Sequence, residues 1–371
     1  MGQRGGQGIG VKGAFDCVIL NDRMDAELAA SVTRTAAPPL FKGSCGTYHA
    51  DACGPLIVAV QNSQVKLDAL ARGHYPGRRL SQESLPGLKT IGHWDAKSEQ
   101  QWGLPPHRNE GIEISFLESG SLAFGVDGED HRLQPGDLTI TRPWQLHRLG
   151  NPYVGSSRLH WLILDLRVRR PHQNWKWPRW VMLSSSEKRE LEINLRQNEQ
   201  PVWHVSSDIC DCFRAIGAAV ENDRDGSNSS RLAIRISDLL LLMLDMFRRR
   251  CIPLDRTLAG SRRTVQLFLS TLWNQSEMLA ADWTVESMAE ECGLKPTQFV
   301  HHVRQLTNRA PIHYLNDCRL QCAANLLADT ERSSVTGVAL TCGFSSSQYF
   351  ATLFRRRFGC SPTKYKQQAI K

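Results

Sequence analysis

The sequence predicts an α+β protein in which an antiparallel β-sheet module precedes an all-α module. One observation is a repeat near the C-terminus, where the pattern of VESMAEECG recurs fifty positions later in VTGVALTCG. Another is the alternation of apolar and polar residues from about Leu88 to Leu166, which is the period of strands. After that stretch, apolar residues follow a helical period. A chain of 371 residues is long enough for two domains.

The first part of the chain gives weaker signals. Residues 1–47 are rich in small residues without a sustained period, so we expect a poorly ordered segment there. Between residues 48 and 72, helical spacing is shown by Leu56, Val60, Leu67 and Leu70. The following HYPGRR ends the pattern, so we expect a helical stretch before the sheet.

The sheet region consists of short apolar runs separated by glycine, aspartate and proline. The runs are GIEISFLESG, SLAFGVDGED, HRLQPGDLTITRP and SRLHWLILDLRV. Turn residues at such short intervals are typical of antiparallel barrels and sandwiches, so one of these is predicted here.

Three helices are expected after the sheet. A capping box at Ser184 to Glu187 opens the first, the second covers Ser207 to Glu221, and the third covers Ser229 to Arg250. The third helix carries a wide apolar stripe, formed by Leu232, Ile236, Leu239, Leu240, Met243, Leu244, Met246 and Phe247. Because such a width suits two partners, we expect a homodimer through part of the stripe, with packing on the sheet alone as the alternative.

Residues 251–260, CIPLDRTLAG, contain proline and glycine without a period and predict a linker. The expected domains are therefore residues 48–250 and residues 261–371. In the second of these, each repeat predicts a helix, a glycine turn and a second helix, the arrangement that lays its second helix in the DNA major groove. A helix from Pro311 to about Ala328 lies between the repeats. Its ~27 Å length would hold the two recognition helices about one DNA turn, ~34 Å, apart.

Charge and cysteine content limit the class of protein. The net charge is +8, and residues 260–371 supply more than half of it. This excess favours double-stranded DNA as a partner, although a merely soluble basic surface is the alternative. None of the 11 cysteines forms a Cys-x-x-Cys pair, so we expect buried packing residues in a reducing cytoplasm. We expect a cytoplasmic protein with no membrane partner, because neither a signal peptide nor a run of ~20 apolar residues is present.

Over residues 260–368, the chain resembles the AraC/XylS family of bacterial transcription regulators. The resemblance rests on the twin repeat and on GFSSSQYFATLFRRRFGCSPTKYK. Polar outer faces and the resemblance together indicate base contacts at Thr297, Gln298, Val300, His301, Ser347, Gln348, Ala351 and Thr352. Phosphate contacts are expected at Arg304, Arg355 and Arg356. Asn308 replaces a usual glycine, and His301 a common arginine, which leaves the base preference of the first copy open.

A second resemblance lies in the sheet region. His107, Asn109, Glu113 and Gly120 follow the first motif of cupin barrels, with Asn109 in place of a histidine. Since one imidazole is missing, we expect neither a bound metal nor another cofactor. The AraC-type resemblance implies that the barrel instead binds a small effector, such as a sugar. The candidates for effector binding are His107, Glu113, Arg142, Trp144, His147 and Trp161, with Arg142 placed inward by strand alternation.

These patterns favour a sequence-specific transcription regulator controlled by an effector, and not an enzyme. The family resemblance implies RNA polymerase as a partner, and activation more often than repression. A metal-dependent cupin enzyme with an accessory DNA-binding domain is the alternative, with His107, Glu113 and His147 as ligands. Architectural DNA binding without base preference is a third hypothesis.

Overall fold

The structure, a computed structural model, describes residues 40–42, 47–49, 53–81, 83–150, 152–223, 226–250, 252–274, 276–329 and 334–369. The poorly ordered segment expected at residues 1–47 lies outside these ranges, apart from strand β1 (Leu40–Lys42) and the first residue of β2 (Thr47–His49). These two strands pair antiparallel.

The helical stretch expected between residues 48 and 72 is a helix followed by a strand. Helix α2 (Gly54–Gln61) ends at a turn in which Ser63 has a φ of 56°, and strand β3 (Lys66–Ala71) follows. Strand β3 pairs along its length with β5 (Leu88–Ala96). The prediction was therefore wrong for residues 66–71, because pairing with a distant strand outweighs a local helical period.

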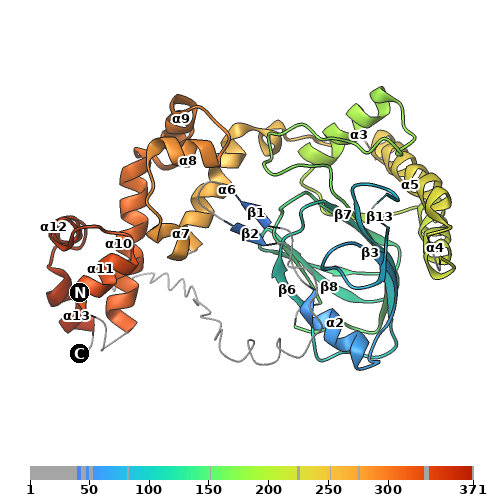
Figure 1. Ribbon diagram of the computed structural model, residues 1–371, viewed down its shortest axis with the longest axis horizontal. Coiled ribbons are helices and arrows are strands. Elements are labelled where there is room, and N and C mark those ends of the chain that lie inside the picture. The colour runs from blue at the N-terminus through green and yellow to red at the C-terminus, as the bar shows by residue number, and fades with distance from the viewer. Residues whose placement is uncertain are drawn as a thin grey trace, which may run out of the picture. The chain divides into compact units, whose positions relative to one another are not determined.

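Two sheets face each other and form a barrel (Figure 1). The other strands are β4 (Arg78–Arg79), β6 (Leu104–His107), β7 (Ile112–Gly120), β8 (Leu122–Val126), β9 (Glu129–Leu133), β10 (Asp137–Thr141), β11 (His147–Leu149), β12 (Ser157–Leu164) and β13 (Val202–His204). The larger sheet has the order β13-β10-β7-β12-β5-β3-β4, and the smaller has the order β6-β11-β8-β9. Among the described strands, β3 and β4 alone pair in parallel. The predicted antiparallel barrel is confirmed, and β13 adds an edge strand from beyond the predicted region.

The larger sheet is apolar on both faces. On β12, Leu159, Trp161 and Ile163 belong to the core inside the barrel, whereas Leu162 and Leu164 belong to the core on the opposite face. Three helices pack on that opposite core, namely α3 (Ser185–Gln197), α4 (Ser207–Glu221) and α5 (Ser229–Arg250). All three occur where the sequence predicts them, and Ser184 forms the expected capping box of α3.

The apolar stripe of α5 lies within the chain's own core. Its members are all buried in the core that α5 shares with the sheet, namely Leu232, Ile236, Leu239, Leu240, Met243, Leu244, Met246 and Phe247. Packing within one chain therefore accounts for the stripe. The outer face of α5 carries Ile234 and Leu241, which are 55% and 37% exposed.

The described residues of the C-terminal part form helices joined by short turns, with no strand among them. A 3-10 helix, η2 (Arg256–Ala259), stands within the expected linker. The helices that follow are α6 (Ser261–Asn274), α7 (Ser276–Ala280), α8 (Val285–Glu291), α9 (Pro296–Thr307), α10 (Pro311–Asp329), α11 (Val335–Thr341), α12 (Ser347–Phe358) and α13 (Pro362–Ala369). Both predicted helix-turn-helix units are present, as α8–α9 and α11–α12. Helix α10 contributes Leu315 to the core of the first unit and Leu320 to that of the second. Within the described ranges, every helix is too short or too polar to span a lipid bilayer.

Candidate nucleic-acid interface and ligand cavity

Local sequence fixes both helix-turn-helix units. Thr284 accepts a hydrogen bond from the Ser287 amide at the start of α8, and Ser346 accepts one from the Tyr349 amide at the start of α12. The second turn depends on Gly343, which has a φ of 84°. A side chain there would also place its Cβ 2.7 Å from the Leu279 carbonyl oxygen, so close approach to α7 requires glycine.

Helix α9 exposes the polar face that the sequence predicts. Thr297, Gln298 and His301 are exposed, Val300 is half-buried, and Arg304 is exposed further along the helix. The opposite face is anchored in the core by Phe299 and Val303, which are fully buried. The helix ends at Asn308, whose φ of 54° shows that asparagine adopts the left-handed turn in place of glycine.

Helix α12 exposes a matching stripe. Gln348 and Thr352 are exposed, and Ser347 and Ala351 are half-buried. The Thr352 hydroxyl donates to the Gln348 backbone oxygen at 2.9 Å, which holds its methyl and lone pairs in a defined orientation. The last turn carries the exposed residues Arg355, Arg356 and Arg357. The predicted base-contacting and phosphate-contacting residues are thus accessible or partly accessible on both second helices.

Helix α10 connects the two units, and Arg319 on it links them. The Arg319 guanidinium donates to the backbone oxygens of Leu279 and Ala281 at 2.8 and 2.7 Å, which caps the end of α7. The same guanidinium lies 5.9 Å from the ring centre of Phe344, next to the second turn. Burial lowers the pKa of Arg319 from its ordinary value. Sequence analysis missed this residue, because an arginine on the partly polar α10 has no distinguishing local pattern.

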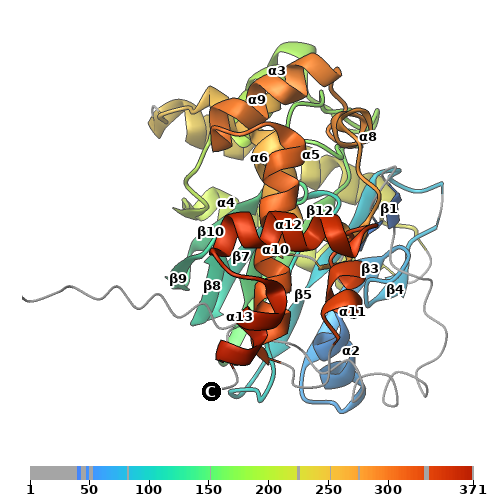
Figure 2. The same ribbon diagram turned by 90° about the vertical axis from the view of Figure 1, so that its left-hand side faces the viewer.

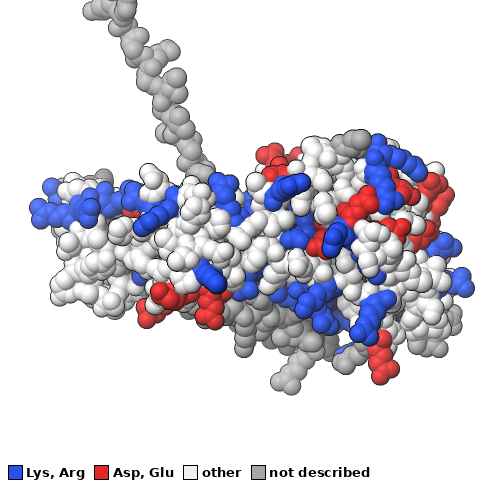
Figure 3. Space-filling model, turned by 90° about the horizontal axis from the view of Figure 1, so that it is seen from above, with Lys and Arg blue, Asp and Glu red and all other residues white. Residues whose placement is uncertain are grey.

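Helices α9 and α12 both contact α10. Figure 1 looks nearly along both helices, and Figure 2 shows both from the side, roughly parallel, with α10 running between them. Figure 3 shows Lys and Arg along one edge of the C-terminal helices, at the left of the view, and Asp and Glu on the opposite edge. Two parallel helices beside a basic edge are suited to a duplex that lies across both.

The barrel encloses a small cavity of about 40 Å³. Its polar lining includes Thr90, His107 and Glu113, and its aromatic lining includes Trp94 and Trp161. Cavity walls of this kind, mainly apolar with a few polar groups, are typical of small-molecule sites. The volume as it stands accommodates about one or two water molecules.

Three neighbouring side chains hold Glu113 in the cavity wall. Its carboxylate accepts hydrogen bonds from Asn109 Nδ2 at 2.5 Å and Ser115 Oγ at 2.9 Å, and it lies 2.9 Å from His147 Nε2. Burial alone would raise the pKa of Glu113, but the hydrogen bond and charge of His147, together with His107, lower it to about 2. The carboxylate is therefore ionised at neutral pH.

The donor atoms of His107, Glu113 and His147 all lie within 4.8 Å of one another, which is close enough for a shared metal. Asn109 does not complete a cupin ligand set in this arrangement, because its amide nitrogen faces Glu113 and its oxygen accepts from Tyr75. Two imidazoles and one carboxylate thus supply three donors, and the fourth position offers an N–H group.

Three of the six effector candidates do not line the cavity. His147 is buried against Glu113, and the other two lie elsewhere. The Arg142 guanidinium donates to the Asn198 backbone oxygen at 2.6 Å, and the Trp144 indole donates to the Val168 backbone oxygen at 2.9 Å. Neither residue lines the barrel cavity. The inward placement of Arg142 was wrong, because β10 ends at Thr141 and strand alternation does not extend into the turn that follows. Conversely, sequence analysis missed Tyr75, Trp94 and Leu56, which line the cavity from segments without a distinguishing motif.

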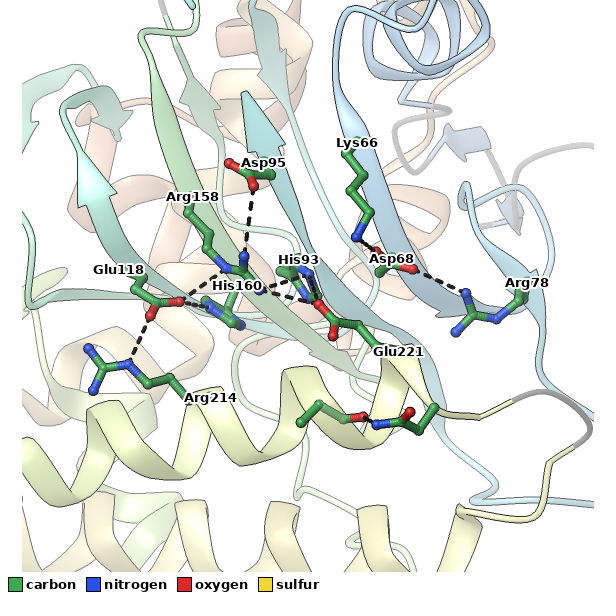
Figure 4. A network of polar contacts seen from close by, with 12 residues as sticks. Lys66, Asp68, Arg78, His93, Asp95, Glu118, Arg158, His160, Arg214 and Glu221 are labelled. Carbon is green, nitrogen blue, oxygen red and sulfur yellow. Dashed lines mark hydrogen bonds and ion pairs between the residues drawn. The ribbon is translucent and has the colours of Figure 1, made fainter. Parts of the chain in front are cut away.

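A second polar cluster lies on the opposite face of the larger sheet, under α4 (Figure 4). Asp68, His93 and Glu221 have donor atoms within 4.8 Å of one another. Arg158 lies 3.3 Å from Glu221, and Lys66 lies 2.9 Å from Asp68, so cations of the chain already neutralise both carboxylates. This cluster is an ion-pair network that ties α4 to the sheet, and its charge is a poor match for a metal ion.

Known proteins resemble both parts of the chain. A helix-turn-helix domain model matches residues 288–368, and a cupin domain model matches residues 97–163. The HTH-type transcriptional activator RhaS of Escherichia coli O1:K1 / APEC is 30% identical over 268 residues, which is 72% of this chain and 89% of that protein. RhaS of Escherichia coli strain SE11 is 31% identical over 267 residues, with the same coverage of both chains.

Solved structures also match. Fatty-acid-bound ToxT from Vibrio cholerae strain SCE256 is 11% identical, covers 77% of this chain and 97% of its own, and has a TM-score of 0.35. The DNA-binding domain of AdpA in complex with a target DNA is 31% identical, covers 28% of this chain and 91% of its own, and has a TM-score of 0.26.

Proposed function

The chain belongs to the AraC/XylS family of transcription regulators, and from that premise we propose that it activates transcription by placing α9 and α12 in successive major grooves of one operator. The observation that carries the proposal is the pair of exposed polar stripes, centred on His301 and on Gln348, on parallel helices joined by α10. Base readout would come from the two stripes and affinity from Arg304, Arg355 and Arg356.

Selection of DNA from a random duplex pool by the full chain tests this proposal. Two enriched sequence boxes, with centres about one helical turn apart (~34 Å), are the expected result. A matched selection with Gln348→Ala and Thr352→Ala combined should retain the first box and lose the second. Architectural DNA binding predicts instead that no sequence is enriched and that a scrambled duplex competes equally.

We propose further that the barrel cavity binds the effector, a small polar molecule of the size of a sugar ring. His107 and Glu113 would supply hydrogen bonds and Trp161 an apolar wall, while His147 would hold the Glu113 carboxylate from outside the cavity. Since the cavity holds only about 40 Å³, an occupant of that size requires the walls to separate. Among the described helices, α2 alone contributes to the lining, through Leu56, so it is the element that we propose moves.

A thermal-shift screen of the full chain against monosaccharides and related polyols tests the effector proposal. A stabilising compound should lose its effect in Trp161→Ala, and the control Trp273→Ala, an exposed residue on α6, should respond like the wild type. If no polyol raises the melting temperature while apolar acids do so, the effector class is wrong.

The metal-dependent cupin enzyme is kept as a second candidate because three donor atoms meet at His107, Glu113 and His147. The orientation of Asn109 weighs against it. Elemental analysis of the purified chain separates the two functions. Stoichiometric iron, manganese or zinc that is lost in His107→Ala would favour the enzyme, whereas a metal-free chain that still activates transcription would favour the regulator.

We also propose a homodimer, with RNA polymerase as a partner at the promoter. The surface that supports dimerisation is the outer face of α5, defined by Ile234, Arg235, Asp238, Leu241 and Asp245. Ile234 and Leu241 are exposed apolar side chains there, and Arg235 and Asp238 are each 45% exposed. In an antiparallel pair of α5 helices, arginines near the start of one helix would face aspartates further along the other.

A further inference from the structure

A groove of about 530 Å³ separates α10 from α12. One wall carries Asp317 on α10 and Arg309 in the turn before that helix, and the α12 wall carries Tyr349 and Arg356. The amide of Asn316 on α10 lies 3.3 Å from the hydroxyl of Tyr349, so one polar contact bridges the two walls. The groove is thus a built feature of the second helix-turn-helix unit and its connecting helix.

The rim of the groove is basic. Three arginines line it, namely Arg309, Arg356 and Arg357, and among its lining residues only Asp317 is acidic. Arg309 is half exposed and forms an ion pair with Asp317 at 2.9 Å, which orients its guanidinium. The remaining positive charge favours an anionic occupant, and guanidinium groups are well matched to phosphate oxygens.

The position of the groove indicates that DNA phosphates are the anions within its reach. Arg309 directly follows Asn308, the residue that ends α9, and Arg356 lies on α12 itself. One wall therefore begins where the first recognition helix ends, and the other is the second recognition helix. When two such helices occupy successive major grooves, the minor groove between them passes the segment that connects the helices.

We propose that this groove binds the backbone phosphates bordering that minor groove, so that the protein senses the width of a DNA segment that neither recognition helix touches. The inference rests on the proposed operator binding. Minor-groove width varies with sequence, and A·T tracts are narrow with enhanced negative potential. Because Arg309 and Arg356 lie on opposite walls, they meet both phosphate backbones only at a restricted width.

The test uses the full chain and the duplex that it enriches from a random pool. The two boxes are kept, and the segment between them is replaced by an A·T tract or by G·C pairs. The wild type should bind one of the two duplexes, the one whose minor groove fits the span between the two arginine-bearing walls, about five- to tenfold more tightly than the other. Arg309→Ala and Arg356→Ala should each bring this ratio close to one and reduce the slope of log affinity against log salt by about 1.

Lys364→Ala is the matched control, because Lys364 is an exposed cation on α13 that does not line the groove. It should keep the wild-type ratio between the two segments. Arg309→Lys retains the charge without the guanidinium fork and should give an intermediate ratio.

The inference is overturned if both alanine variants keep the wild-type ratio. If Gln348→Ala still loses base preference in that case, operator binding stands and only the groove assignment fails. If the alanine variants keep their DNA affinity but reduce transcription in a reconstituted reaction, the groove binds an acidic protein partner. That result would also overturn the inference. Failure to enrich any duplex would overturn operator binding and, with it, this inference.

Discussion

On the proposed function, single residues of α12 divide into those that identify bases and those that hold the duplex. Gln348→Ala and Thr352→Ala should each cost about 1–3 kcal/mol on the operator and relax preference at one position, because each removes a base-edge contact. Arg355→Ala should weaken binding to all duplexes alike, because a phosphate contact carries no sequence information. Fluorescence anisotropy with operator and scrambled duplexes measures both effects. Equal losses on the two duplexes for Gln348→Ala would contradict its assignment to base readout.

His160 gives the barrel a pH-dependent stability. Its Nε2 lies 2.7 Å from a Glu118 carboxylate oxygen beneath α4 (Figure 4), and burial lowers its pKa to about 4 despite that partner. Since an unfolded histidine has a pKa of about 6.5, the unfolded chain binds the proton first as the pH falls. The stability that neutral His160 contributes is therefore complete above about pH 6.5 and is lost as the pH falls towards 4.

Urea unfolding followed by tryptophan fluorescence checks this expectation. Between pH 7 and pH 5, the wild type should lose on the order of 2 kcal/mol from this residue. His160→Gln should show a correspondingly smaller loss, whereas His313→Gln, at an exposed position on α10, should behave like the wild type. If all three proteins lose the same free energy of unfolding between pH 7 and pH 5, His160 is not the source of the pH dependence.

At the scale of elements, helices are predicted more securely than strands and turns. Helix α5 and the pair α9 and α12 combine a complete apolar period with recognisable ends, so local sequence determines them. Strand β3 fails this criterion, because its residues fit a helical period and only pairing with β5, about twenty residues on, makes it a strand. Its prediction required knowledge of a partner that the local pattern does not contain.

The candidate sites follow the same division. Exposed positions on α9 and α12 could be predicted from helix geometry and family resemblance alone. The cavity could be predicted only in part: His107, Glu113 and Trp161 line it, but Arg142 does not, because its position depends on where β10 ends. Residues such as Tyr75 enter the cavity from turns, for which neither periodicity nor a motif gives a direction.

The connection between the two helix-turn-helix units depends on Arg319. In Arg319→Ala, the carbonyl groups of Leu279 and Ala281 lose their partner, and the second turn is no longer fixed to α7. We expect affinity for a duplex with both boxes to fall about tenfold or more, with little change for a duplex with one box, because the spacing between recognition helices is lost. The stability cost should be about 1–3 kcal/mol.

Gel-shift titrations with one-box and two-box duplexes measure this difference. Arg319→Lys retains a cation that reaches only one of the two carbonyl groups at a time, so it should lie between the wild type and the alanine variant. Equal losses on both duplexes would indicate general unfolding of the C-terminal helices and would contradict a role in spacing.

In the whole molecule, one strand serves two cores. On β12, Trp161 faces the ligand cavity, while Arg158 and His160 on the other face join the network beneath α4. An occupant that separates the cavity walls would therefore also strain the contacts between the sheet and α4. Such an effector controls the protein only if it binds two states with different affinity. Because β12 connects the cavity to the network beneath α4, we expect the second state to differ by a displacement of the α4–α5 pair.

The outer face of α5 should accordingly govern assembly. Ile234→Asp introduces a charge at a 55%-exposed apolar position without disturbing the buried stripe, so the monomer should keep its fold while the homodimer is weakened by at least about tenfold. Sedimentation velocity measures the dimer constant, and circular dichroism confirms the fold. The control Met182→Asp alters an equally exposed apolar residue, 59% accessible, outside α5. If both variants dimerise like the wild type, another surface joins the protomers. If only Ile234→Asp fails to dimerise, cooperative binding to operators with two half-sites should also be lost. The reason is that two linked protomers would no longer present four recognition helices to one promoter.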